Sequence, residues 1–300
     1  MLFRSCSIKF MKLHYNNIRI SVLTAIKKYA AAICLMCIVA AIFSGCGIYA
    51  GTTGKNTQDD EGLPEILIGS DDYSPFNYVD SNGRQAGIDV ELATEAFRRM
   101  GYKAKFVLIE WENKNQLLES GEIDCLWGCF SMDGRENDYK WAGPYMLSHQ
   151  AVAVREDSDI YTLKDLEGRV VAVQSTTKPE QMFKENEKYG VSRPGKVISV
   201  HKRELIYTFL SKGYVDAIAA HDTSIEYFMR QYNMEYRILD EPLSVVGLGA
   251  AFSLHDERGL NRQLSDVLQE MKSDGTIYSV IRKYLGNADG YYIEVDDYEE

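Results

Sequence analysis

Histidine is scarce in this sequence, and its distribution narrows the possible chemistry. Five histidines occur among 300 residues. They show neither the close spacing of a metal-binding cluster nor the partnership with a serine and an acid that would indicate a hydrolytic triad. We therefore expect no catalytic residue, no metal and no cofactor.

Cysteine is also scarce in the part of the chain that is expected to fold. Four of the six cysteines fall within the first 46 residues. The other two, Cys125 and Cys129, lie four positions apart in an expected strand, so their Cα atoms would be about 13 Å apart, too far for a disulfide. We expect both to be small buried side chains rather than a redox or metal-binding pair.

Positive charge is sparse beyond the N-terminal region. The chain has 33 basic and 44 acidic residues, and six of the basic residues lie within the first 45 positions. Without that segment, 27 basic residues face 44 acidic ones, a formal charge of −17. Such a charge repels nucleic acid, so we expect no nucleic-acid partner. Residues 289–300 are strongly acidic, and we predict that they form a solvated tail.

The N-terminal region has the pattern of an export signal. The first 45 residues contain no acid, and an apolar run extends from Tyr29 to Phe43. The run is shorter than the roughly 20 residues that span a membrane, so we predict that residues 1–45 are a cleaved signal peptide. Met11 is an alternative start of translation.

The end of this signal resembles the lipobox of bacterial lipoproteins. The segment IFSGC ends at Cys46, and Phe43 stands where that family usually has leucine. The resemblance implies that Cys46 is acylated and anchors the protein to the cell membrane on the extracytoplasmic side. The alternative is an ordinary export signal with an incidental cysteine.

The rest of the chain alternates short apolar strands with amphipathic helices. Residues 46–62 are polar and rich in glycine, so we expect a flexible tether. Beyond them we expect strands at 65–69, 104–108, 123–128, 151–154, 170–174, 197–200, 215–220 and 245–252. We expect helices at 90–100, 115–120, 179–189, 203–212, 224–232, 260–271 and 277–284. This alternation predicts an α/β fold, and its length of about 225 residues favours two lobes.

Four segments, in order, resemble the amino-acid-type (family 3) solute-binding proteins of ABC importers. They are DYSPF at 72–76, GIDVEL at 87–92, SMDGRE at 131–136 followed by GPY, and GYVDAI at 213–218 followed by HDT. Within GIDVEL we expect Gly87 to turn the chain and Asp89 to cap a helix.

The resemblance implies a two-lobed, periplasmic-binding-protein-like fold of type II, with two hinge strands and a ligand cleft between the lobes. Lobe 1 would comprise 63–148 and 246–288, and lobe 2 would comprise 149–245. The function that it implies is that of a monomeric, extracytoplasmic component that binds an amino acid or a close analogue by hinge closure and delivers it to a membrane permease.

The resemblance also implies how the two ends of an amino acid are held. Arg135 would bind the carboxylate with the backbone near Ser131 and Asp133, because a guanidinium keeps its charge and offers two coplanar donors. Asp222 would bind the ammonium group. The alternatives are a solvated loop arginine for Arg135 and a helix cap for Asp222.

The remaining site residues follow from the same resemblance. Tyr73 and Phe76 would form an aromatic wall, with Trp127 as a further member unless it belongs to the core. Thr176 and Thr177 follow a strand and precede a helix, so their backbone N–H groups would face a carboxylate.

Two other functions remain open at this stage. One is an enzyme on the same scaffold, a cyclohexadienyl or arogenate dehydratase, which would need an acid such as Glu110 or Asp72. The other is a stand-alone ligand sensor. Asp71, Asp72 and Glu110 together would suit a cationic amino acid, but exposed acids are ordinary in so acidic a chain.

Overall fold

The structure is a computed structural model that describes residues 62–293. The predicted signal peptide, Cys46, nearly all of the predicted tether and residues 294–300 lie outside this range. Within it, no helix is both long enough and apolar enough to cross a membrane.

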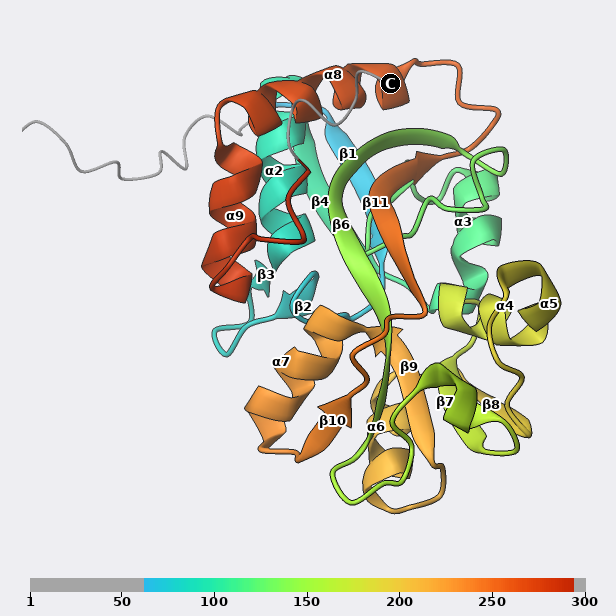
Figure 1. Cartoon of the computed structure of the whole chain (residues 1–300). Helices are drawn as coiled ribbons and strands as arrows, with labels where there is room; N and C mark the ends of the chain where they lie inside the picture. Colours follow the sequence, from blue (N-terminus) through green and yellow to red (C-terminus); the bar gives the residue numbers. More distant parts are fainter. Residues whose placement is uncertain (1–61, 294–300) are drawn as a thin grey trace, which may run out of the picture. The chain divides into compact units, whose positions relative to one another are not determined.

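The centre of the molecule is a mixed β-sheet (Figure 1). Among the described residues it contains nine strands in the spatial order β4-β1-β5-β11-β6-β9-β7-β8, and β10 pairs with β6. A separate hairpin is formed by β2 (Tyr78–Val79) and β3 (Gln85–Ala86). The strands of the sheet are β1 (Glu65–Ser70), β4 (Lys103–Leu108), β5 (Cys125–Leu126), β6 (Lys140–Arg155), β7 (Val170–Gln174), β8 (Lys196–Val200), β9 (Ala217–His221), β10 (Tyr236–Ile238) and β11 (Ser244–Phe252).

Helices cover the sheet and follow the spacing of apolar residues. In one of them, Leu260, Leu264, Leu268 and Met271 recur every three or four positions and are all buried, which places them on one face. The helices are α2 (Ile88–Arg99), α3 (Lys114–Ser120), α4 (Lys178–Lys184), α5 (Asn186–Tyr189), α6 (Glu204–Ser211), α7 (Asp222–Tyr232), α8 (Leu260–Ser273) and α9 (Thr276–Leu285), with short 3₁₀ turns at Trp111–Asn113 and Leu163–Leu166.

The sheet is divided into two lobes that share two long strands. In the first lobe β1 runs parallel to β4 and β5, and in the second lobe β7 runs parallel to β8 and β9. Strand β6 pairs with β11 up to Gln150 and with β9 from Gln150 onward. The chain therefore crosses between the lobes along β6 and returns along β11, as α/β folds with a discontinuous lobe do.

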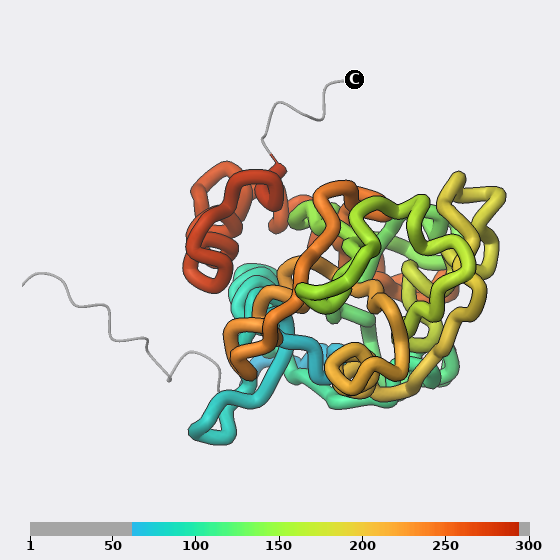
Figure 2. The backbone as a smooth tube through the Cα atoms, turned by 60° about the horizontal axis from the view of Figure 1, so that its bottom comes forward, coloured from blue at the N-terminus to red at the C-terminus, as the bar shows by residue number. Residues whose placement is uncertain are grey.

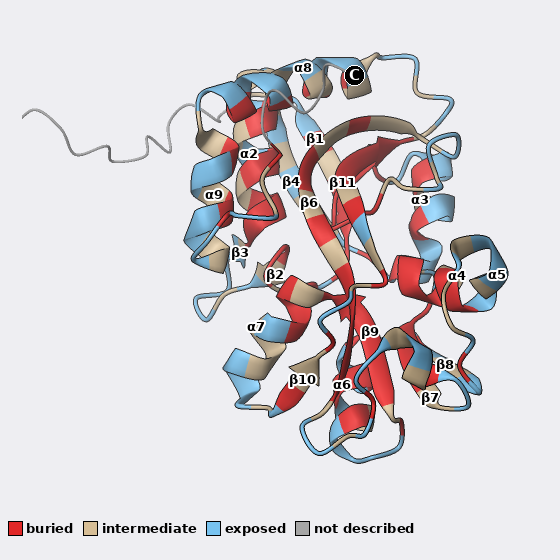
Figure 3. Cartoon of the chain, in the orientation of Figure 1, coloured by how far each residue is buried: buried red, intermediate tan, exposed pale blue. Residues whose placement is uncertain are grey.

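Each lobe has its own core. Figure 3 shows buried positions along the strands and on the helix faces turned toward them. The first core joins Ile68 and Phe97 with Leu264 and Ile281 of the C-terminal helices, and Figures 1 and 2 both show α9 beside α2. The sequence alone did not assign these last helices to a lobe.

Three elements differ from the sequence prediction. Strand β6 begins at Lys140 rather than near residue 151, although Gly143 and Pro144 interrupt its pattern, and proline is rare inside strands. Strand β5 contains only two residues, and the backbone turns three residues later at Cys129, where φ is +50°. The predicted helix at 179–189 is split into α4 and α5.

Asp89 does not cap α2, which corrects the prediction from GIDVEL. The residue that precedes the helix is Gly87, at φ +131°, and a Cβ atom there would lie 2.1 Å from the carbonyl oxygen of Phe76. The buried Asp89 carboxylate instead accepts hydrogen bonds of 2.7 Å from the Cys129 N–H and from the Tyr145 hydroxyl. Burial raises the pKa of Asp89 to about 6.

The first residues of the predicted acidic tail are packed rather than solvated. Ile293 is buried, and the Tyr291 carbonyl accepts a hydrogen bond of 2.8 Å from the Leu147 N–H. The Tyr291 hydroxyl donates to the Asp222 carboxylate at 2.9 Å. Residues 289–293 therefore contact both β6 and α7. The segment contains aromatic and aliphatic side chains beside its acid, and these side chains favour packing over solvation.

Candidate ligand-binding pocket

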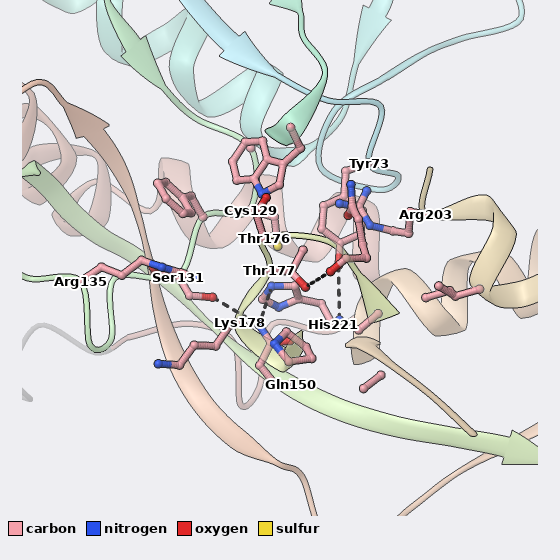
Figure 4. Close-up of a pocket in the computed structure, with 18 residues that line it drawn as sticks. Tyr73, Cys129, Ser131, Arg135, Gln150, Thr176, Thr177, Lys178, Arg203 and His221 are labelled. Carbon is pink, nitrogen blue, oxygen red and sulfur yellow. Dashed lines mark hydrogen bonds between the residues drawn. The ribbon is translucent and has the colours of Figure 1, made fainter. Parts of the chain in front are cut away.

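A pocket lies where the carboxyl ends of several parallel strands meet (Figure 4). Ligands bind at this position in open α/β sheets. The space among its lining residues is about 440 Å³, part of it open to solvent. Tyr73, Cys129, Ser131 and Arg135 line it from the first lobe, Gln150 from β6, and Gln174, Thr176, Thr177, Lys178, Arg203 and His221 from the second.

Arg135 projects into this pocket from the loop after β5. Its guanidinium lies 5.2 Å from the centroid of the Phe130 ring, and its Nη1 donates to the Ser131 carbonyl at 3.1 Å. Within residues 62–293 it forms no ion pair with a carboxylate. Burial lowers the pKa of Arg135 from its ordinary value, and the group stays charged because an arginine pKa begins so high. A half-buried cation of this kind is suited to pair with an anionic ligand.

The loop from β7 to α4 supplies the opposite side of the pocket. Thr176 has φ +58°, unusual for a β-branched residue, and its N–H donates to the Glu180 carboxylate at 2.8 Å. The Thr177 hydroxyl donates to the Gln174 carbonyl at 2.6 Å. The two threonines therefore line the pocket as predicted, but the Thr176 N–H is already satisfied within the protein.

Arg203, for which the sequence predicted no role, bonds to and packs against other residues at the pocket. Its Nη2 donates to the Asp71 carboxylate at 2.9 Å, and its guanidinium carbon lies 3.0 Å from the centroid of the Tyr73 ring. Gln174 donates to the same Asp71 oxygen at 3.0 Å. The signal in the sequence was position: Arg203 follows β8 and precedes α6, at the end of the sheet where ligands bind.

The structure brings His221, and not Asp222, into the pocket. His221 is buried, with Nδ1 2.7 Å from the Ser148 hydroxyl and Nε2 2.8 Å from the Gln150 amide nitrogen. Burial, followed by the charge of Arg203, lowers the pKa of His221 to about 3. The ring is therefore neutral near pH 7.

Asp222 is the first residue of α7 and does not line the pocket. Its Oδ2 pairs with His149 Nδ1 at 2.8 Å and accepts the Tyr291 hydroxyl. Its Oδ1 accepts the Thr223 N–H at 2.7 Å. Strand β9 ends at His221 and α7 begins at Asp222, and of the two side chains that of His221 faces the pocket.

The other predicted site residues divide into pocket and core. Tyr73 and Ser131 line the pocket. Phe76 is buried behind Tyr73, with the two ring centroids 5.6 Å apart. Trp127 is a core residue that packs against Tyr145 at 5.4 Å. Asp133 lies outside, where its carboxylate accepts the Gly247 N–H at 2.9 Å.

The two cysteines of the described range are free and buried. Burial raises the pKa of the Cys129 thiol well above its usual value, so this pocket-lining side chain is an uncharged thiol. Between residues 62 and 293 no group of histidine, cysteine, aspartate and glutamate has the arrangement of a metal site.

Comparison with known proteins places these observations in context. The model of the bacterial extracellular solute-binding proteins, family 3, matches residues 66–287. A protein of Vibrio harveyi that is named as an amino-acid ABC transporter-binding protein, PatH, is 27% identical over 227 residues, which are 74% of this chain and 89% of that protein.

Two solved structures extend the comparison to the fold. An ancestral arginine-binding protein bound to arginine has a TM-score of 0.67 at 27% identity, covering 74% of this chain and 98% of that one. The ancestral amino-acid-binding protein AncCDT-1, described as a precursor of cyclohexadienyl dehydratase, has a TM-score of 0.65 at 25% identity, covering 74% and 95%.

Proposed function

The chain belongs to family 3 of the bacterial extracellular solute-binding proteins, and on that premise we propose that it is the solute-binding component of an ABC importer. It binds an amino acid or a close analogue outside the cytoplasm and presents it to a membrane permease. Lobe 1, at 63–148 and 246–288, and lobe 2, at 149–245, close on the ligand as units.

The observation that carries this proposal is the pocket that both lobes build. Arg135 comes from the first lobe, and Thr177 and Arg203 come from the second. Polar contacts also join the lobes, since Arg203 bonds Asp71 and Lys178 Nζ donates to the Asp133 carbonyl at 2.9 Å. A ligand that contacts both lobes stabilises the closed form, because only that form offers all of its contacts.

A thermal-shift screen of the twenty amino acids and their simple carboxylate analogues tests this function. A ligand present at a hundred times its Kd stabilises the folded state by about 2.7 kcal/mol, which raises Tm by roughly 5–10 °C in a chain of this size. We expect at least one compound to do so. If no compound raises Tm, the proposed function is wrong.

Arg135→Ala connects the shift to the pocket. The variant removes the cation that pairs with the ligand carboxylate, so the shift is expected to disappear. Arg84→Ala is the matched control, because Arg84 is exposed and, within the described residues, its guanidinium pairs with Asp80 on the β2–β3 hairpin. Equal shifts in both variants would place the ligand elsewhere.

A dehydratase would need an acid in the pocket, and none of the described residues that line it is an aspartate or a glutamate. Glu110 and Asp72, the two candidates for the catalytic acid, are exposed and do not line it. We expect that incubation with arogenate or prephenate yields no product, and turnover of either compound would establish an enzyme instead.

A further inference from the structure

The charged residues that line the pocket are all cations. They are Arg135, Lys178 and Arg203, and none of the described residues that line the pocket is an aspartate or glutamate. Lys114 adds a fourth cation directly behind the lining, where its Nζ donates to the Thr176 hydroxyl at 3.0 Å. Figure 4 shows Arg135 and Arg203 on opposite sides of His221.

Only one of these four cations has an anionic partner within residues 62–293. Arg203 pairs with Asp71. The other three, Arg135, Lys178 and Lys114, are bound to uncharged oxygens: the Ser131 carbonyl, the Asp133 carbonyl with the Tyr189 hydroxyl, and the Thr176 hydroxyl. Lys178 and Lys114 are about 4% and 5% exposed. Because buried charges are normally paired, this excess of positive charge calls for an anion.

The lowered pKa values of two neighbouring groups, Lys114 and His221, agree with a positive potential at the pocket. Burial lowers the pKa of Lys114 to about 8, and the charge of Arg135 acts in the same direction. Burial is the main cause of the lowered pKa of His221, and the charges of Arg203 and Arg135 lower it further. Both groups therefore lie within the positive potential that a bound anion would neutralise.

The pocket offers uncharged acceptors where an ammonium site was expected. Asp222 lies outside it, and Asp71 is occupied by Arg203 and Gln174. Two amide oxygens, Gln150 Oε1 and Gln174 Oε1, are buried and have no hydrogen-bond partner in the described structure. The Gln174 amide nitrogen faces the Asp71 carboxylate and the His201 carbonyl, so that side chain must present its oxygen elsewhere.

We propose that the pocket selects a small acid with two carboxylates, either an acidic amino acid or a dicarboxylate, over neutral and cationic amino acids. This inference rests on the proposed function and names the ligand class of the same site. The carboxylates pair with Arg135 and Lys178, Lys114 adds positive potential from behind the lining, and the two amide oxygens accept one donor group of the ligand, an ammonium or a hydroxyl. Asp71, Asp72 and Glu110 suggested a cationic amino acid, but such a ligand does not fit a pocket lined by cations.

Titration calorimetry of the purified full chain with matched acids and amides tests the proposal. Glutamate and glutamine differ by one charge at nearly equal size, as do aspartate and asparagine. We expect each acid to bind about tenfold or more tightly than its amide, because a charge-assisted hydrogen bond to a buried cation is worth that much, and arginine to bind more weakly still. Glutarate and 2-hydroxyglutarate, measured beside glutamate, show whether the donor group is an ammonium or a hydroxyl.

Two variants tie the preference to the pocket. Lys178→Met keeps the length of the side chain and removes its charge, so the acid-to-amide ratio is expected to fall. Lys188→Met is the control, because Lys188 is exposed and pairs with Glu185. His221→Asp places a carboxylate in the pocket and is expected to weaken acids relative to amides.

The outcomes separate the two proposals. An acid-to-amide ratio below tenfold, or tighter binding of a neutral or cationic amino acid, overturns the selection for two carboxylates and leaves the solute-binding function intact. Failure of every compound to bind the wild type overturns the solute-binding function, and the inference with it.

Discussion

At the scale of single residues, His221 links the pocket to the pH dependence of stability. Its pKa is about 3 in the folded protein, against 6.5 in an unfolded chain. Between these values the unfolded chain binds a proton that the folded protein does not, so His221 lowers the free energy of unfolding as pH falls from 6.5 toward 3. Asp89, with its raised pKa of about 6, contributes the opposite slope between pH 6 and 4.

The variant His221→Gln isolates this contribution. Because the Asp89 contribution is common to both proteins, the stability of the variant relative to the wild type is expected to rise as pH falls, by up to about 1.4 kcal/mol per pH unit. Urea unfolding between pH 4.5 and 7 measures it. His255→Gln, at an exposed position, is the control. A difference that stays constant across this range would mean that the pKa of His221 is the same in the folded and the unfolded protein.

Gly87 provides a second test at this scale. An alanine there would hold φ +131° and bring its Cβ within 2.1 Å of the Phe76 carbonyl oxygen. We expect Gly87→Ala to lower the free energy of unfolding by roughly 2–5 kcal/mol, from backbone strain and overpacking together. Gly83→Ala separates the two causes, since Gly83 also has positive φ but no neighbour within 4 Å, and a loss of only roughly 1–2 kcal/mol is expected. Equal losses would show that the close approach is unimportant.

The sequence pattern places Arg135 at the pocket that the structure shows, but it does not place His221 there. An arginine in a loop that resembles the family motif can be recognised from its residue type and its position in the motif. The choice between His221 and Asp222 depends on where β9 ends and α7 begins, and sequence patterns do not locate such a boundary to the residue. Arg203 and Lys178 escaped notice because arginine and lysine are usually exposed, and their burial results from the contact between two lobes distant in sequence.

At the scale of secondary-structure elements, the segment after α9 fastens the second lobe to the hinge. Tyr291 donates to Asp222 at the start of α7 and stacks edge-on against His149 of β6. Tyr291→Phe removes the hydroxyl and keeps the ring, so we expect a loss of about 1–3 kcal/mol for a bond to a charged group. Tyr214→Phe, at a side chain 68% exposed, is expected to change little. Equal effects on urea unfolding would contradict a fastening role.

The helices could be predicted more fully than the strands. Apolar residues at three- and four-residue spacing place α2, α8 and α9 directly, because each helix buries one face. Strand β5 is too short to show alternation, and β6 continues through Gly143 and Pro144, where local preference opposes a strand. The pairing of β6 with β11 from Lys140 to Gln150 overrides that preference, and no local sequence pattern indicates this pairing.

At the scale of the whole molecule, the predicted lipid anchor would hold the protein at the membrane. Cys46 lies outside the described residues, so the prediction rests on the lipobox-like segment that ends there. We expect the wild-type protein to fractionate with membranes and Cys46→Ser to appear in the soluble extracytoplasmic fraction, with its ligand affinity unchanged. Identical fractionation of both proteins would favour an ordinary export signal.

Hydrogen-exchange mass spectrometry of the full chain tests most directly whether a ligand closes the pocket between the two lobes. Exchange is compared with and without an equimolar mixture of the free amino acids and their dicarboxylate analogues. We predict slower exchange in both lobes at once, at the loop 128–135 in the first and at the segments 174–178 and 201–204 in the second. Protection in one lobe alone, protection away from these segments, or no change would contradict a ligand-closed pocket between the lobes.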